Sequence, residues 1–321
     1  MIPDAVLIQS FGGPDAPRDV APFLANVVRG RPVPASRLEQ VASQYLSLGG
    51  VSPLNDLNRR LATRVASVFA RRDSSVAVYV GNRNWRPYLA DTMREMIAAG
   101  VQSAAVFTTS PYSSYSGCRQ YMDDLDAAAG QLGSGIPQLK RVGPYFDHPG
   151  FLDPLADGLA EAAAALPGTV PVLMTAHSIP SSMASNCQYQ SQLEYVAGEV
   201  ATRSGVEASR TRLVYQSRSG SPSHPWLGPD IADAIDEATA DHDTVIVVPI
   251  GFVSEHMEVL YDLDVAARER ALSRGARLVR TPTSGSDPRF AEMVFELVRR
   301  ATSETTPRPW CGAGCCEAAT S

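Results

Sequence analysis

Short, continuously apolar segments alternate with longer amphipathic segments along most of the chain, and this alternation limits the possible folds more than any other feature. Each apolar segment is too short for a helix and is bounded by Gly, Pro or Ser, which predicts a buried strand. Strands are predicted at 4–10, 76–81, 103–108, 137–142, 170–176, 212–216, 244–250 and 277–281. Strands that are apolar on both faces are typical of parallel sheets covered by helices on both sides.

The amphipathic segments predict the helices that cover these sheets. They fall at 17–29, 35–47, 54–71, 87–99, 114–129, 150–166, 188–204, 229–240, 256–273 and 287–302. Because the alternation occurs twice over similar lengths, we expect two similar doubly wound, Rossmann-like α/β domains with parallel sheets, at 1–146 and 147–302. A tail at 303–321, rich in Thr, Pro, Gly and Cys, follows them.

Composition narrows the class of protein. The 321 residues are 44% hydrophobic and 19% charged, which is typical of a globular chain. Lys+Arg 28 against Asp+Glu 34 gives a net charge of −6, which argues against a nucleic-acid partner because such binding needs a basic surface. No apolar run approaches the ~20 residues of a membrane span, and the N-terminus is predicted to be a strand rather than a signal peptide. We expect a cytoplasmic monomer without a transmembrane segment.

The residues that directly follow the strands are the candidate site, because α/β folds bind ligands at the carboxyl ends of their parallel strands. These segments lie at 10–14, 82–85, 109–113, 177–180, 217–220 and 251–256, and they are rich in polar and aromatic residues. The first contains FGGP, which is not the G-x-G-x-x-G of dinucleotide-binding oxidoreductases. Neither the G-x-S-x-G of hydrolases nor the H-E-x-x-H of zinc peptidases is present.

His177, Glu258 and Asp262 are the strongest candidates for chemistry. His177 comes directly after an apolar strand, and Glu258 and Asp262 are four apart on a predicted helix, where they share a face. An imidazole opposite two carboxylates can accept protons and bind a divalent cation transiently. The alternatives are a histidine at a strand end with a structural role, and an acidic helix face that contacts only solvent.

Five separated blocks occur together in a fixed order: LIQSFGGP, GGVSPLN, LMTAHSIP, YQSRSG…PWLGP and VVPIGFVSEHMEVLYDLD. Together they resemble the ferrochelatase family over residues 4–302, and YVGNRNW with the cysteine tail resembles its actinobacterial branch. The resemblance implies a chelatase-like fold and insertion of Fe²⁺, a substrate, into a porphyrin during haem biosynthesis, with release of two protons. Coproporphyrin III is the favoured porphyrin, giving coproheme. The alternatives are a protoporphyrin IX ferrochelatase, a cobalt chelatase of the corrinoid route and a non-catalytic haem-binding or porphyrin-binding chaperone.

The resemblance also assigns site residues. His177 and Glu258 would be the catalytic pair, and together with Asp262 they would form the route for the iron and the protons. The family often has a further acidic residue at the position of Ala266, so the outer end of this route differs here. Phe11 stands where some bacterial relatives have a tyrosine that ligates the product iron. The porphyrin-binding residues implied are Phe11, Arg29, Arg31, Ser52 and Tyr121.

The five cysteines do not form a disulfide framework, because their number is odd and the chain is expected to be cytoplasmic. They are Cys118, Cys187, Cys311, Cys315 and Cys316. Relatives with such a tail carry a [2Fe–2S] cluster, which needs four cysteines. We expect the three tail cysteines and Cys187 as ligands, because Cys118 falls on a predicted helix of the first domain. Cys118 as the fourth ligand and a tetrahedral zinc site are the alternatives.

Overall fold

The computed structural model describes residues 2–30, 33–72, 74–219 and 224–303, and these residues divide into two compact units. Of the described residues, unit 1 contains 2–109, 120–143 and 294–303, and unit 2 contains 110–119 and 144–293. Arg31 and the three tail cysteines lie outside the described residues. The domain boundaries expected from the sequence stay a prediction.

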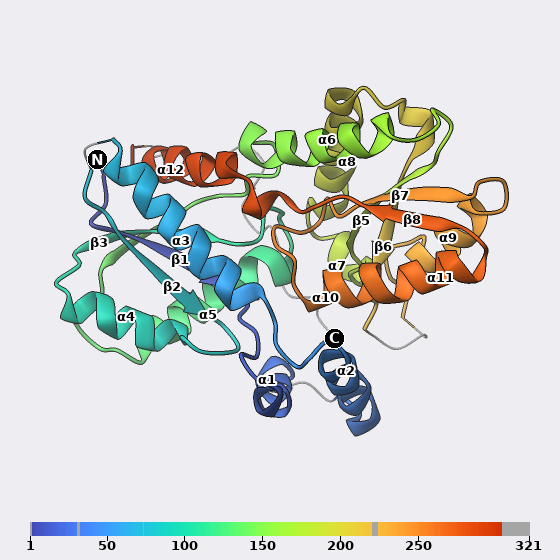
Figure 1. Cartoon of the computed structure of the whole chain (residues 1–321). Helices are drawn as coiled ribbons and strands as arrows, with labels where there is room; N and C mark the ends of the chain where they lie inside the picture. The colour runs from blue at the N-terminus through green and yellow to red at the C-terminus, as the bar shows by residue number, and fades with distance from the viewer. Residues whose placement is uncertain (1, 31–32, 73, 220–223, 304–321) are drawn as a thin grey trace. The chain divides into compact units, whose positions relative to one another are not determined.

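Unit 1 is built on a four-stranded parallel sheet of order β2-β1-β3-β4 (Figure 1). Its strands are β1 (Ala5–Ser10), β2 (Ala77–Asn82), β3 (Ser103–Thr108) and β4 (Gln138–Arg141). Its helices are α1 (Val20–Val27), α2 (Ala35–Ser47), α3 (Leu54–Ala70), α4 (Leu89–Ala98) and α5 (Gln120–Gly130). Leu7 and Val106 of the sheet share a buried cluster with Met93 of α4 and Leu125 of α5, and α3 contacts β1 and β2.

Unit 2 repeats this topology with the order β6-β5-β7-β8, again all parallel (Figure 1). Its strands are β5 (Val172–His177), β6 (Thr211–Gln216), β7 (Thr244–Val248) and β8 (Arg277–Arg280). Its helices include α6 (Pro149–Ala164), α7 (Ser181–Ala184), α8 (Tyr189–Ser204), α9 (Ile231–Ala238), α10 (Met257–Val259) and α11 (Arg268–Ser273). Leu173 and Val247 pack in one buried cluster with Ile235 of α9 and Ala271 of α11, while α6 and α8 contact the sheet through β7 and β6.

The predicted fold class, two α/β units with parallel sheets, is confirmed. Each predicted strand is present with small shifts at its ends. The final helix, α12 (Pro288–Ser303), begins in unit 2 and ends in unit 1. Within the described part of the chain, no helix is both long and apolar enough to cross a membrane.

Two of the predicted helices contain π-helical segments, which the sequence analysis did not anticipate. The helix expected at 256–273 consists of α10, a π-helix at Leu260–Ala267 and then α11. The helix expected at 114–129 begins as a π-helix at Tyr115–Arg119 and continues as α5. A π-helix bonds i to i+5, is rare, and frequently occurs at functional sites. The first of these segments carries Asp262, so it lies within the predicted site.

Candidate active site

His177 is the last residue of β5, at the carboxyl end of the sheet of unit 2. Its Nδ1 lies 2.5 Å from the carbonyl oxygen of Ser178, which can only accept, so Nδ1 carries a hydrogen and donates it. The hydroxyl of Tyr189 donates to the carbonyl of His177 at 2.9 Å. The first contact orients the ring and leaves Nε2 as the nitrogen available for exchange, and the second holds the backbone of His177.

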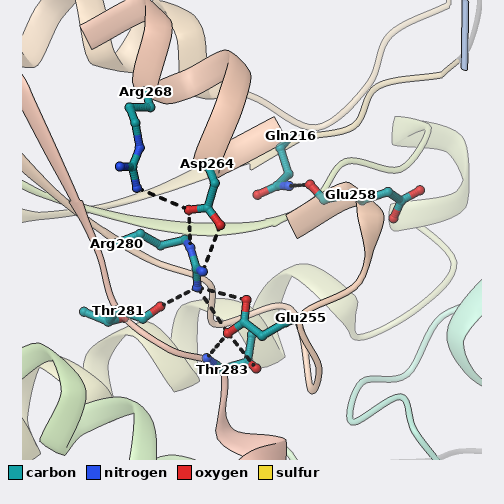
Figure 2. Close-up of polar contacts among 8 residues, drawn as sticks. All are labelled: Gln216, Glu255, Glu258, Asp264, Arg268, Arg280, Thr281 and Thr283. Atoms are coloured by element: carbon teal, nitrogen blue, oxygen red, sulfur yellow. Dashed lines mark hydrogen bonds and ion pairs between the residues drawn. The ribbon is translucent and has the colours of Figure 1, made fainter. Parts of the chain in front are cut away.

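Glu258 of α10 provides the group that faces this nitrogen. Its Oε1 lies 3.6 Å from Nε2 of His177, and its side chain is 50% exposed. Gln216 at the end of β6 donates from Nε2 to the backbone carbonyl of Glu258 at 3.0 Å (Figure 2). The predicted pair is therefore brought together, with both side chains partly buried.

The two groups shift each other's titration in opposite directions. Burial lowers the pKa of His177, but the Glu258 carboxylate outweighs it and raises that pKa to about 9. Burial raises the pKa of Glu258, but His177 outweighs it and lowers that pKa to about 2. At neutral pH the pair is an imidazolium beside a carboxylate.

Asp262 lies in the π-helix, and Ser217 is its hydrogen-bond partner. The Ser217 hydroxyl donates to Asp262 Oδ2 from the loop directly after β6. Ser217 has a φ of 62°, and it is the one non-glycine with positive φ among the described residues. Burial, together with the nearby Glu258 carboxylate, raises the pKa of Asp262 to about 6 against the lowering effect of the Ser217 hydroxyl. Asp262 is therefore partly protonated near neutral pH.

The predicted iron route of His177, Glu258 and Asp262 is not assembled as a resident metal centre. Among the described residues, no three His, Cys, Asp or Glu side chains gather closely enough to hold a metal ion. His177 and Glu258 face one another, whereas Asp262 bonds to Ser217. The arrangement is that of a proton-exchanging pair with a second carboxyl group one turn away.

The predicted porphyrin-binding residues that the structure describes all belong to unit 1. Phe11 packs edge-on against Phe23, with ring centroids 6.2 Å apart. Ser52 is 4% exposed, and its backbone N–H donates to Pro14 O at 2.8 Å. A Cβ added to Gly13 would lie 2.5 Å from the Cβ of Ser52, so these two segments require glycine at their close approach.

The other two described members of this set differ in burial. Tyr121 is 6% exposed, its carbonyl accepts from Gln9 Nε2 at 2.8 Å, and the guanidinium of Arg83 lies 5.7 Å from the centre of its ring. Arg29 is exposed and donates to Asn26 Oδ1 at 2.5 Å. Tyr121 is thus held in the fold, while the guanidinium of Arg29 is accessible to an anionic ligand.

Three further residues shape the site: Gln216 and Tyr189, which were not among the predicted site residues, and Ser217, which was included only as part of the strand-end segment 217–220. Gln216 is the last residue of β6, Ser217 is the first residue of the loop that follows, and Tyr189 is the first residue of α8. The position of Ser217 directly after a strand was a usable signal, since strand-end residues were expected to converge. Gln216 and Tyr189 act through backbone carbonyl groups, which no side-chain motif reveals.

The reason for preferring Cys187 over Cys118 as a cluster ligand is wrong in one respect. Cys118 was expected on a helix of the first domain, but the structure places it on the π-helix Tyr115–Arg119 within unit 2, the unit that also contains Cys187. Both residues are partly exposed. Cys187 follows α7 and its Sγ lies 3.7 Å from Ala184 O. Domain membership therefore does not distinguish the two cysteines.

Comparison with known proteins first defines the class and then the family. The solved structure of CbiX, the terminal enzyme of sirohaem biosynthesis in denitrifying bacteria, has a TM-score of 0.54 at 16% identity, covering 92% of this chain and 99% of that chain. At that identity the likeness shows the fold alone, a chelatase fold. The Ferrochelatase family model matches residues 3–302.

Curated relatives match nearly the full chain. The coproporphyrin III ferrochelatase of Frankia alni is 48% identical over 340 residues, covering 98% of this chain and 86% of the relative. A ferrochelatase of Rhodopirellula baltica is 44% identical over 314 residues, covering 96% of this chain and 89% of the relative. The chain belongs to the Ferrochelatase family, which is a family of enzymes.

Proposed function

We propose that this protein inserts Fe²⁺ into coproporphyrin III to give coproheme, with release of two protons. The observation that carries the proposal is the His177–Glu258 pair at the carboxyl end of the unit 2 sheet, in a chain that belongs to the Ferrochelatase family. The Frankia relative, named for coproporphyrin III, supports this choice of porphyrin.

The reaction requires a group that removes protons. A free porphyrin has two pyrrole N–H groups, and both protons must leave as Fe²⁺ enters, so a base must lie at the wall of the binding site. Because His177 already holds a proton at neutral pH, it can accept one from the porphyrin only after it has released its own. Fe²⁺ near the Glu258 carboxylate would favour that release, since its charge opposes the imidazolium. Asp262, with a pKa near neutrality, is suited to receive the proton and pass it on.

The porphyrin itself is proposed to contact unit 1 through Phe11, Arg29, Arg31, Ser52 and Tyr121. Arginine is suited to the propionates because its guanidinium binds a carboxylate bidentately. Phe11 offers an aromatic face without an iron-ligating atom. Binding the macrocycle in a distorted form would expose its nitrogen lone pairs at a cost of ~1–5 kcal/mol.

The test compares porphyrins with the wild-type protein. Under anaerobic conditions with Fe²⁺, we expect the Soret spectrum of the iron porphyrin to appear faster from coproporphyrin III than from protoporphyrin IX. Faster turnover of protoporphyrin IX would reverse the choice of substrate. Insertion of Co²⁺ into a corrinoid precursor but not of Fe²⁺ into either porphyrin would favour the cobalt chelatase.

A variant distinguishes catalysis from binding alone. Glu258→Gln keeps the size of the side chain but removes the charge, so turnover should fall on the order of 100-fold while the Kd for coproporphyrin III changes little. A wild-type protein that binds coproporphyrin III without inserting any metal would instead be a porphyrin-binding chaperone.

We further propose that a [2Fe–2S] cluster is bound by Cys311, Cys315, Cys316 and Cys187. Four thiolates are the donor set for this cluster, and Cys187 is a partly exposed thiol that forms no disulfide among the described residues. Bound, the cluster would supply a cross-link between the tail and unit 2. Cys187→Ser should abolish the visible absorption of the purified protein, and Cys118→Ser should not. The reverse result would assign the ligand to Cys118, and zinc without iron or sulfide on elemental analysis would replace the cluster.

A monomer in the cytoplasm is the proposed working state. Cell fractionation and size-exclusion chromatography test the two parts separately, and a membrane-bound fraction or a dimeric mass would contradict them.

A further inference from the structure

Arg280, the last residue of β8, forms ion pairs with two carboxylates, Glu255 and Asp264 (Figure 2). Its side chain is only 15% exposed. Its Nε and Nη2 donate to the two carboxylate oxygens of Asp264 at 2.7 and 2.9 Å, a bidentate pair. Its Nη1 donates to Glu255 Oε1 at 3.1 Å and to the carbonyl of Thr281 at 3.0 Å.

The two carboxylates that Arg280 joins lie on either side of residues 258–262 in the sequence. These residues, the catalytic segment, carry Glu258 and Asp262. Glu255 comes three residues before Glu258, and Asp264 comes two residues after Asp262 within the π-helix. Glu255 is fixed further by Thr283, whose N–H and hydroxyl donate to its Oε1 at 2.9 and 3.1 Å. One guanidinium therefore connects both ends of the segment that carries Glu258 and Asp262.

The catalytic segment needs such a restraint for two physical reasons. The Glu258 side chain is 50% exposed, so its distance from His177 depends on where the backbone of α10 lies. The segment then enters the π-helix Leu260–Ala267, whose i to i+5 bonding is rare and occurs mostly as short insertions in α-helices. Contacts from outside the helix must therefore contribute to its position.

We propose that Arg280 is a positioning residue for the His177–Glu258 pair, acting through Glu255 and Asp264. The inference rests on the proposed metal insertion. A displacement of about 1 Å at a catalytic group can cost on the order of 100-fold in rate. A residue that holds the backbone around Glu258 can therefore affect turnover measurably without touching the substrate.

The matched control is Arg203 of α8, which also joins two carboxylates of unit 2. It donates to Asp153 Oδ1 at 2.7 Å and to Glu199 Oε2 at 2.9 Å, and neither partner belongs to the 255–264 segment. Arg280→Gln and Arg203→Gln should each lower the melting temperature by roughly a few degrees. Only Arg280→Gln should lower kcat, by on the order of 10- to 100-fold, with the KM for coproporphyrin III unchanged.

The conservative variant and a double variant separate positioning from general stability. Arg280→Lys restores the charge without the bidentate geometry, so it should recover most of the melting temperature but only part of kcat. In a Glu258→Gln background, adding Arg280→Gln should cost less than about 2-fold, because the residue acts through a group already lost. Adding Arg203→Gln to the same Glu258→Gln background gives the reference for an arginine that does not contact the 255–264 segment.

The outcomes distinguish this inference from the proposed function. If the wild-type protein inserts Fe²⁺ and Arg280→Gln retains wild-type kcat, the positioning role is wrong and the function stands. Equal losses of kcat in Arg280→Gln and Arg203→Gln would reduce the effect to stability and also overturn the inference. A wild-type protein without metal insertion contradicts the proposed function itself.

Discussion

The two sheets share one topology, yet their corresponding strand ends carry different chemistry. The central strands β1 and β5 each have six residues, and their last residues are Ser10 and His177. Ser10 is in register with Asn82 of β2, and His177 is in register with Gln216 of β6. The same backbone position thus presents a hydroxyl in unit 1 and an imidazole in unit 2.

The side chains that contact these strand-end residues also differ in charge. In unit 1, Thr109 donates to the Ser10 hydroxyl at 2.9 Å and Asn82 donates to Asn55 Oδ1 at 3.1 Å, so the contacts are between neutral groups. In unit 2, His177 faces the Glu258 carboxylate. The comparison shows that the doubly wound fold supplies an edge for ligands, while the side chains at that edge decide whether it can perform chemistry.

The largest expected effect comes from truncating the side chains at these two equivalent positions to alanine. His177→Ala removes the proton acceptor, so turnover of coproporphyrin III should fall on the order of 100- to 10 000-fold. Ser10→Ala removes a neutral hydrogen bond in unit 1 and should leave kcat within about 2-fold. Steady-state kinetics of both variants under anaerobic conditions make the measurement.

Porphyrin affinity provides the control for this pair of variants. Fluorescence titration should give a Kd for coproporphyrin III close to that of wild type in both. Wild-type turnover by His177→Ala would contradict the assignment of the catalytic pair. A large loss in Ser10→Ala would show that the edge of unit 1 takes part in the chemistry.

An intermediate effect is expected from Phe11→Ala in unit 1. Removing the ring deletes aromatic contact area, so the KM for coproporphyrin III should rise about 10-fold, in line with ~1–2 kcal/mol of binding energy. kcat should be nearly unchanged, because the reacting groups lie in unit 2. A fall in kcat at constant KM would move Phe11 from binding to the chemical step. Val27→Ala, in the same apolar cluster, controls for packing.

Much of this architecture was predictable because parallel strands and their covering helices leave strong periodic signals. The continuous apolar runs at 170–176 and 244–250 predict β5 and β7 with shifts of one or two residues. His177 and Glu258 were predictable as candidates because each lies at the carboxyl end of such a strand or on the helix that follows it. Their contact at 3.6 Å agrees with that expectation.

The remaining features depend on contacts that a linear pattern does not contain. Leu263, Ala267 and Ala271 are spaced as in an α-helix, so the π-helix between α10 and α11 gives no separate signal. The bond from Ser217 to Asp262 spans 45 residues, and that from Arg280 to Glu255 spans 25 residues. Periodicity identifies the elements that carry these groups, whereas only the packed structure shows which of them meet.

The smallest effect, a change in stability, concerns the second carboxyl group of the unit 2 edge. Burial raises the pKa of Asp262 from 3.8 to about 6 in the folded state. Because the folded value is the higher one, the stabilising contribution of protonated Asp262 is complete below pH 3.8 and is lost as the pH rises through 6. Above that range the folded protein must hold an ionised, partly buried carboxylate.

Asp262→Asn removes this cost and keeps an oxygen that can accept from Ser217. We therefore expect its melting temperature to exceed that of wild type by on the order of a few degrees near pH 8, and the difference to vanish near pH 4. Asp241→Asn makes the same change in net charge at an exposed position and should show no such pH dependence. Differential scanning calorimetry of the three proteins measures the effect. An Asp262→Asn variant that is less stable than wild type near pH 8 would mean that the Asp262 carboxylate is compensated within the folded edge. The contrast between the neutral Ser10 position of unit 1 and the charged edge of unit 2 would then come from His177 and Glu258 alone.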